Sequence, residues 1–517
     1  MSLMKSIGSS KIRVDAQSKV TGSAIYPGDI VMDDMLHMKI LFAERCHARI
    51  LSIDTTLAES APGVVTVITA KDVPVNEYGL IMPDQPVLCG PGSDKEGVDI
   101  VRWEGDQIAL IVAETEDQAN HARDLVKVEW QDLTAYYSVN DAMAPDATPL
   151  HPDRENNTLV HWKIRRGDMA VGWDKSDVII ESEYITPAQE HAYLQPEAGV
   201  GFIDEQGRVT VRVAGQWTHE DQEQIAHALA LPEEQVRVIY DAIGGAFGGR
   251  EDMSVQIVLA LAALRLNRPV KVVWTRQESI KGHHKRHPAR IISRWGATKD
   301  GQLVAAESTI LADAGAYAYT TTKVLGNANL MVTGPYYVPN VHVDTIGVYT
   351  NNPPGGAFRG FGGPQAAFAA ESQMNKLAAA LGMDPVAFRM KNLLDEEKTL
   401  PTGGPLPPVV SLDKVLSSCA LEAGWKQLDD QWKLPKTDNT NPKVTRGIGI
   451  ACSFKNVGFS FGFPENSWAR VKIAGEGEID QVILYQAGAD CGQGAHTAMA
   501  QMVAEALQVP FDVVQVV

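Results

Sequence analysis

The stretch Ile225-Ala-His-Ala-Leu-Ala-Leu-Pro-Glu-Glu-Gln-Val-Arg-Val238 runs straight into a glycine-rich loop, Asp241–Gly249. Its pattern predicts an amphipathic helix, a proline-containing turn and a strand. The same pattern returns without gaps in Val503-Ala-Glu-Ala-Leu-Gln-Val-Pro-Phe-Asp-Val-Val-Gln-Val516. We interpret the two stretches as an internal repeat; the alternative is a chance similarity between two helix–turn–strand units. If the repeat is real, the loop that would follow the second copy lies beyond residue 517.

The segments on either side of this unit predict a mixed α+β protein. The expected strands are 64–69, 108–113, 178–185 and 208–214, with a hairpin of 291–298 and 302–311 that turns at 299–301. The expected helices are 115–126 (with Thr115 as N-cap), 220–230, 365–381, 384–394 and 412–423. Polar, proline-bearing stretches at 139–158 and 395–446 separate these groups. We therefore expect a domain at 1–138, a linker at 139–160, a second domain at 161–445 and a final unit at 446–517.

Composition narrows the function classes. The net charge of −18 would repel phosphate backbones and anionic lipid, so we expect neither nucleic acid nor a membrane as partner. No apolar signal region is visible in the first 17 residues, and the most apolar stretch, Val255–Leu264, is shorter than the roughly 20 residues that a bilayer requires. The 5 cysteines include no CxxC pair, which disfavours an iron–sulfur cluster or zinc ribbon on this chain. These features predict a soluble, reduced, cytoplasmic protein.

Three glycine-rich loops are the best candidates for binding: Gly244–Glu251, Gly355–Gln365 and Gly488–Thr497. Glycines let a backbone approach a ligand closely and offer N–H groups to anions. The first loop is not a nucleotide-binding P-loop, because Arg250 and Glu251 replace the required Lys and Ser/Thr. Three such loops favour a large polyanionic cofactor over a simple nucleotide. The alternative is that each loop is only a tight turn.

Five motifs, in this order, resemble the molybdenum subunits of the xanthine dehydrogenase and aldehyde oxidase family. They are Arg13–Tyr26, Gln189-Glu-His-Ala-Tyr-Leu194, GGAFGGRE from Gly244, AFRGFGGPQ from Ala357 and GQGAHT from Gly492. The resemblance implies an a/b-hammerhead domain at 1–138, a molybdenum-cofactor-binding domain at 161–445 and the start of a second one, incomplete, at 446–517.

The resemblance also implies which residues lie at the cofactor. Gln189 matches a glutamine whose amide lies beside the molybdenum ligands, and Arg359 matches a position close to the reacting centre. The implied cofactor-binding set is completed by Gly245, Phe247, Gly248, Gly492 and Gln493. The metal would be held through the pterin dithiolene without a direct protein ligand, near Gln189 and Phe247. The family's glutamate base is expected beyond residue 517.

Three residues match the family's substrate positions. Phe361 matches an aromatic residue that stacks on ring substrates, and Glu251 matches a carboxylate that hydrogen-bonds heteroaromatic rings. Asn327 stands where purine oxidisers carry an arginine, and loss of that charge would weaken stabilisation of a developing anion. A nicotinate-type substrate therefore fits at least as well as xanthine. The segment Asn352–Phe358 has no cysteine, which disfavours a copper-containing carbon monoxide dehydrogenase.

The implied reaction is hydroxylation of an activated C–H of an N-heterocycle or an aldehyde, with oxygen taken from water. The implied cofactor is molybdenum–molybdopterin in its cytosine dinucleotide form. The [2Fe–2S] clusters and FAD would lie on partner subunits, an iron–sulfur subunit and an FAD subunit. The alternative is a catalytically incomplete cofactor-binding or assembly component, either a truncation or one half of a naturally split large subunit.

The histidine-rich segment His283-His-Lys-Arg-His287 resembles a metal or phosphate patch. We expect it instead to be a solvated extension of the strand at 270–275, in which neighbouring histidines point to opposite faces and cannot share a metal. His191 and His496 are expected to be hydrogen-bonded structural residues rather than bases.

Overall fold

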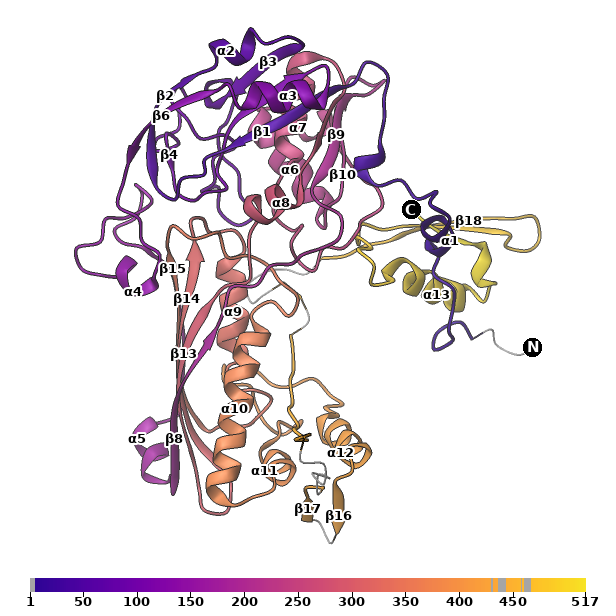
Figure 1. Ribbon diagram of the computed structural model, residues 1–517. Helices are drawn as coiled ribbons and strands as arrows, with labels where there is room; N and C mark the ends of the chain where they lie inside the picture. The colour runs from indigo at the N-terminus through magenta and orange to yellow at the C-terminus, as the bar shows by residue number, and fades with distance from the viewer. Residues whose placement is uncertain (1–4, 429–430, 436–442, 457, 460–465) are drawn as a thin grey trace.

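Two large β-sheets, stacked end to end, give the molecule its elongated shape, and a smaller C-terminal unit projects from the side (Figure 1). The computed structural model describes residues 5–428, 431–435, 443–456, 458–459 and 466–517. The mixed α+β class is confirmed.

The first sheet has the strand order β11-β10-β9-β12-β1-β5-β3. Its strands are β1 (Leu36–Phe42), β3 (Val64–Thr69), β5 (Gln107–Ala113), β9 (Ala198–Ile203), β10 (Val209–Val213), β11 (Val236–Tyr240) and β12 (Val270–Val273). β1 pairs in parallel with β12, with Leu36 opposite Val270, so the N-terminal segment and a later one share one sheet. Helices α3 (Glu116–Arg123), α6 (Thr218–Leu229) and α7 (Gln256–Leu266) pack on this sheet.

The second sheet has the order β7-β15-β14-β13-β8. Its strands are β7 (Thr158–Arg166), β8 (Val178–Thr186), β13 (Ala289–Ala297), β14 (Leu303–Gly315) and β15 (Asn340–Tyr349). Helices α9 (Thr321–Met331) and α10 (Gly363–Leu381) cover one face (Figure 1). Helices α11 (Pro385–Asn392) and α12 (Leu412–Glu422) follow them.

Short elements complete the chain. They are α1 (Ala16–Thr21), β2 (Ala48–Asp54), α2 (Thr56–Glu59), β4 (Ile100–Val101), β6 (Lys127–Asp132), α4 (Val139–Ala142), α5 (Met169–Asp174), α8 (Arg276–Gly282), β16 (Lys426–Leu428) and β17 (Gln431–Lys433). The C-terminal unit contains β18 (Arg470–Ala474), β19 (Gln481–Tyr485), α13 (Ala495–Leu507) and β20 (Val514–Val516). In Figure 1 the N-terminal segment with α1 lies against this unit, and Val14 N donates to Thr497 Oγ1 at 3.1 Å.

The helix, turn and strand that the sequence predicts for both copies of the proposed repeat are present. In the first copy α6 leads through a 3₁₀ turn at Glu233–Gln235 into β11, and in the second α13 leads through Phe511–Val513 into β20. The two helices end at equivalent left-handed residues, Ala230 and Gln508. β11 is parallel to β10, as β20 is parallel to β19. The two copies therefore share topology as well as sequence pattern.

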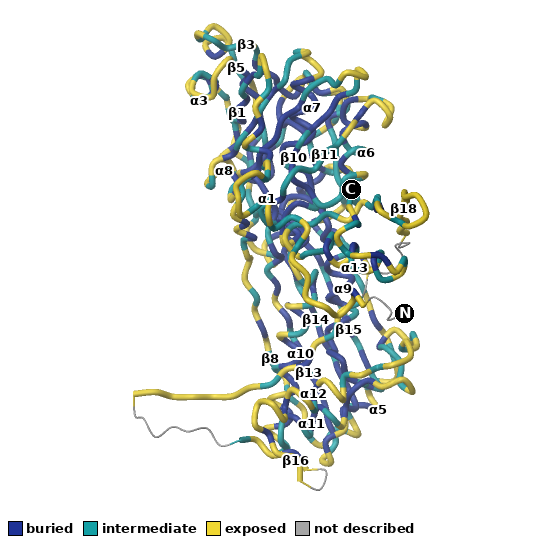
Figure 2. Tube along the Cα trace, turned by 90° about the vertical axis from the view of Figure 1, so that its right-hand side faces the viewer, coloured by how far each residue is buried: buried dark blue, intermediate teal, exposed yellow. Residues whose placement is uncertain are grey.

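The apolar core lies between each of the two large sheets and the helices that pack on it (Figure 2). Leu259 and Ala260 of the apolar helix α7 are fully buried. This explains why the most hydrophobic stretch of the sequence is a core helix. Among the described residues, no helix combines the length and hydropathy that crossing a membrane would require.

Candidate functional site

The three glycine-rich loops meet at one place. Arg359 N, in the second loop, donates to Phe247 O in the first at 2.9 Å. A Cβ on Gly248 would lie only 2.8 Å from Ala357 O, so glycine is needed for this close approach. Ala246 of the first loop packs in one apolar cluster with Ala489 of the third. The loops therefore form one shared surface.

Three side chains on this surface, from two of its loops, are exposed or only partly buried. The Phe247 side chain is 45% exposed on a backbone with φ of 57°, a left-handed conformation that is costly for a bulky residue. Phe361, in the second loop, is also left-handed, with φ of 48°. The exposed Arg359 guanidinium makes no hydrogen bond or ion pair with any residue that the structure describes. Strained aromatic residues and an unpaired cation are typical of a ligand site.

The segment 283–287 is not solvated, so that prediction was wrong. His283, His284 and His287 are 3%, 1% and 0% exposed. Helix α8 intervenes between β12 and this segment, which consequently does not continue the strand. The segment turns inward because backbone carbonyls of the second loop offer hydrogen-bond acceptors there. His284 Nε2 donates to Ala357 O at 3.1 Å.

His191 has the predicted structural role. Its Nε2 donates to the same carbonyl, Ala357 O, at 2.7 Å. Burial lowers the pKa of His191 to about 3, and burial likewise lowers the pKa of His284 well below its usual range. Both imidazoles are therefore neutral near pH 7, and together they anchor the second glycine loop.

One group of side chains has the composition of a metal site. Glu190, His191 and His283 each bring a ligand atom within 4.8 Å of the others. The Glu190 carboxylate already contacts two basic side chains. His283 Nε2 lies 3.0 Å from Glu190 Oε1, and Lys285 Nζ lies 2.8 Å from Glu190 Oε2. Burial would raise the pKa of Glu190, but His283 and Lys285 hold it well below its usual range. An ion-pair network thus accounts for the cluster.

Glu251 is the last residue of the first loop, and it forms no ion pair with any described residue. Its Oε2 is buried and has no hydrogen-bond partner among the described residues. Burial raises the pKa of Glu251 to about 8. At neutral pH this carboxyl is mostly protonated and can donate a hydrogen bond as well as accept one.

Asn327 and Phe361 are linked through one residue. Asn327, on α9, is fully buried, and its Nδ2 donates to Phe459 O at 3.1 Å. The rings of Phe361 and Phe459 have centroids 5.5 Å apart. A polar amide and an aromatic ring, without a charge between them, thus lie next to the second loop.

The third loop is held by its own side chains and by the N-terminal motif. Gln493 Oε1 accepts from Cys491 N at 2.7 Å, and Gln493 Nε2 donates to Ala489 O at 2.8 Å. The Arg13 guanidinium donates to Gly492 O. His496 Nε2 donates to Gly488 O at 3.0 Å, which confirms its predicted structural role. Both polar side-chain atoms of Gln493 thus bond within their own loop.

Comparison with known proteins identifies the class of site. Two family models of the molybdopterin cofactor-binding domain match residues 150–393 and 419–517. A model of the a/b hammerhead domain of aldehyde oxidase and xanthine dehydrogenase matches residues 21–134. The nicotinate dehydrogenase large molybdopterin subunit of Eubacterium barkeri is 38% identical over 418 residues, which cover 81% of this chain and 96% of that subunit. The chain belongs to the xanthine dehydrogenase and aldehyde oxidase family.

Two further family members extend past the matched region. A probable xanthine dehydrogenase subunit of Bacillus subtilis is 36% identical over 96% of this chain but only 64% of its own length. The structure of the Desulfovibrio gigas aldehyde oxidoreductase matches with a TM-score of 0.86 and 28% identity, over 99% of this chain and 56% of that one. The chain thus spans about two thirds or less of these two relatives. The predicted order, an a/b-hammerhead domain followed by cofactor-binding domains, is confirmed.

The residues present fit an anionic pterin cofactor of this family. Arg359 offers an unpaired guanidinium, and Gly492 and Gly494 have no neighbour within 4 Å of where a Cβ would stand. Gly492 N and Gly494 N already donate to Asp490 Oδ1, at 3.0 and 3.2 Å, so these glycines would admit a ligand by close approach rather than through free N–H groups. Gly245 has φ of +98° and a Cβ there would lie 3.0 Å from Tyr193 Cβ, so its role is in packing the loop.

Two residues of this site were not predicted from the sequence. Arg286 contacts both Gln189 and the second loop, and Arg13 contacts the third loop. Arg13 had a signal, because it opens the first family motif. Arg286 had only a misleading one, because it lies among charged residues that suggested exposure.

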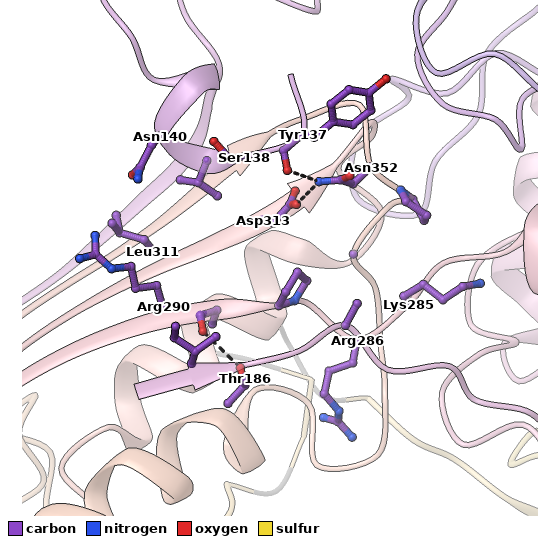
Figure 3. Close-up of a pocket in the computed structure, with 17 residues that line it drawn as sticks. Tyr137, Ser138, Asn140, Thr186, Lys285, Arg286, Arg290, Leu311, Asp313 and Asn352 are labelled. Carbon is purple, nitrogen blue, oxygen red and sulfur yellow. Dashed lines mark hydrogen bonds between the residues drawn. The ribbon is translucent and has the colours of Figure 1, made fainter. Parts of the chain in front are cut away.

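Beside the loops, a cavity of about 460 Å³ opens between α4 and the ends of β8, β13 and β14 (Figure 3). Asn352 Nδ2 donates to Tyr137 O at 2.9 Å across its rim. The Arg286 guanidinium points away from Leu311 and Asp313 in this view, toward the glycine loops (Figure 3). The cavity therefore lies behind the loop surface.

Proposed function

We propose that this chain is the molybdenum-cofactor subunit of an oxidoreductase that hydroxylates an activated C–H of an N-heterocycle or an aldehyde. The observation that carries the proposal is the convergence of Phe247, Arg359 and three glycine loops on one surface. When bound, the molybdenum cofactor would supply the oxidation, with oxygen from water. The protein's own contribution would be to cradle the pterin and to orient a flat substrate.

For the cofactor, we propose that Gln189, Arg359 and the glycines of the three loops hold the pterin and its phosphates. Arg359 is free to pair with an anion, and glycine backbones allow close approach. The cytosine dinucleotide form remains part of this proposal, as do Gly492 and Gln493 as pterin contacts. Because the hydrogen bonds of Gln493 lie within its own loop, its contact would be through the backbone or by exchange of those bonds.

For the substrate, we propose an N-heterocycle of the nicotinate or purine type. Phe361 would stack on the ring. Glu251, neutral near pH 7, would donate to a ring nitrogen or accept from a ring N–H. Asn327 supplies no positive charge, so a substrate that develops negative charge at this end would be stabilised less than by arginine.

For partners, we propose an iron–sulfur subunit and an FAD subunit that take the electrons, in a cytoplasmic complex. The coverage of 96% of a nicotinate dehydrogenase large molybdopterin subunit supports a second possibility for completing the site. In it, a separate large-subunit half would supply the rest of the cofactor-binding region. The second candidate function is a catalytically incomplete cofactor-binding component.

The test is cofactor content. The chain is co-expressed with the proteins of its neighbouring reading frames, the complex is purified, and molybdenum and released pterin nucleotide are measured. We expect one molybdenum per copy of this chain and a cytidine nucleotide after acid release. A complex with iron–sulfur clusters and flavin but without molybdenum would refute the proposal. A loaded complex that turns over no heterocycle or aldehyde would favour the incomplete component.

A further inference from the structure

Arg286 connects the two segments that carry Gln189 and Arg359. Its Nε donates to Gln189 Oε1 at 3.1 Å, and its Nη2 donates to Arg359 O at 2.9 Å. The guanidinium lies over the Phe358 ring, 4.1 Å from the centroid. Backbone bonding adds a third link, since Arg286 N donates to Gln189 O at 3.0 Å. At 8% exposure, the side chain is fixed from three sides.

A guanidinium has only donors, so the atom of Gln189 that faces Arg286 must be the amide oxygen. The other end of the amide, Nε2, has no hydrogen-bond partner among the described residues, and Gln189 is an exposed residue. The contact therefore decides which end of the amide is offered to a ligand. It offers an N–H donor, which suits an oxygen or sulfur acceptor of an anionic group.

The charge of Arg286 also indicates that an anion binds nearby. No carboxylate among the described residues forms an ion pair with it; its acceptors are an amide oxygen and a backbone carbonyl. Burial lowers the pKa of Arg286, as expected for a cation that is removed from water without a counter-ion. A buried cation of this kind is stabilised when an anion binds nearby. A residue that only linked the two segments could be a neutral hydrogen-bond donor, whose burial costs less free energy than that of a cation.

We propose that Arg286 is a positioning residue that holds the Gln189 amide with its N–H toward the bound cofactor and locks it to the Arg359 loop. This inference rests on the proposed function, because it assigns the cofactor to the side of Gln189 that Arg286 leaves free. Arg286 itself touches neither cofactor nor substrate in this arrangement and acts through Gln189 and the second loop.

The test is a double-mutant cycle in the purified complex, with Arg286→Met, Gln189→Ala and the double variant. Removing an outer contact of a metal site commonly costs about 10–100-fold in activity. We expect Arg286→Met to lower kcat by about that factor, with KM changed less than threefold and molybdenum content within twofold of the wild type. Because one residue acts through the other, the double variant should lose no more than the worse single variant. The Mo(V) EPR signal should change in the same way in both single variants.

The matched control is Arg290→Met. Arg290 lies four positions further along, pairs with Glu183 at 2.8 Å and is well exposed, so kcat should remain within twofold. Arg286→Lys should not rescue activity, since an ammonium lacks the planar fork that reaches both acceptors; if Arg286→Met fails to fold, Arg286→Lys replaces it in the cycle.

Outcomes separate the two proposals. Wild-type complex without molybdenum refutes the proposed function. If the wild-type complex is loaded and active, three results overturn only the positioning role. They are additive losses in the cycle, a fully active Arg286→Met variant, and loss of molybdenum from that variant.

Discussion

Replacing Gly248 by alanine tests whether the first and second glycine loops must touch. A Cβ at this position would lie 2.8 Å from Ala357 O and 2.9 Å from the Ala357 carbonyl carbon. Both neighbours are backbone atoms of a loop that His191 and His284 anchor, so they cannot move aside without breaking those contacts. The backbone of Gly248 also has φ of +98°, which disfavours any L side chain.

The two costs can be added. A left-handed conformation costs a residue with a Cβ about 1–2 kcal/mol. Overpacking against atoms that yield only partly costs about 1–3 kcal/mol. The expected loss in free energy of unfolding is therefore about 2–5 kcal/mol. Gly207→Ala is the control, because Gly207 has φ of +78° but nothing within 4 Å of its Cβ position. It should lose only the first part, about 1–2 kcal/mol.

Urea titration, followed by tryptophan fluorescence, measures both variants, and molybdenum content is measured in the co-expressed complex. We expect Gly248→Ala to lose more stability than Gly207→Ala and to retain less than half of the wild-type molybdenum, whereas Gly207→Ala retains all of it. Equal stability losses, together with full molybdenum content in both variants, would show that the close approach of the loops is not needed to form the site.

Three other changes probe single interactions. Burial raises the pKa of Asp221 from 3.8 to about 7, so the neutral carboxyl stabilises the fold below about pH 4 and this stabilisation is lost as the pH rises to 7. Asp221→Asn should therefore flatten the pH dependence of the free energy of unfolding in urea over that window. An unchanged slope would contradict the assignment. Arg389→Met removes the guanidinium that lies 2.7 Å from the buried Glu371 carboxylate. The loss of this cation should lower the free energy of unfolding by about 3–5 kcal/mol. Adding Glu371→Gln should recover part of that loss, and no recovery would mean that lost packing dominates. Glu251→Gln should impair turnover of ring substrates far more than of aldehydes and remove a pH dependence near 8, whereas equal losses would exclude Glu251 from the substrate site.

Local signals allowed most elements of the fold to be predicted. Thr115 caps α3 as expected, since its side chain accepts from Gln118 N at 3.3 Å. The hairpin of β13 and β14 turns where a Lys-Asp-Gly sequence predicted it. What no local pattern could reveal is the parallel pairing of β1 with β12, more than two hundred residues apart. Such pairing is fixed by the whole apolar surface of the sheet, and single segments do not encode it.

The site was predicted as a set of loops but not as a network. The structure brings together three residues that the family motifs named, since Arg359 N donates to Phe247 O and Arg286 bonds both Gln189 and Arg359. Arg286 and the buried histidines around it were misjudged because polarity in a sequence usually means exposure. Their burial depends on acceptors such as Ala357 O for His284 and Arg359 O for Arg286, which a distant loop supplies and which are visible only in three dimensions.

The internal repeat explains where the chemistry lies and where it does not. In the first copy β10 reaches α6 through four residues, 214–217, whereas in the second β19 reaches α13 through residues 486–494, which hold the third glycine loop. The first glycine loop instead follows β11. The repeated elements thus supply two equivalent scaffolds, while the loops that bind were placed in non-equivalent connections. They meet because Ala246 of one connection packs with Ala489 of the other. On the proposed function, we expect a substitution in a repeated helix to affect stability first, and one in either glycine-rich connection to affect cofactor retention first.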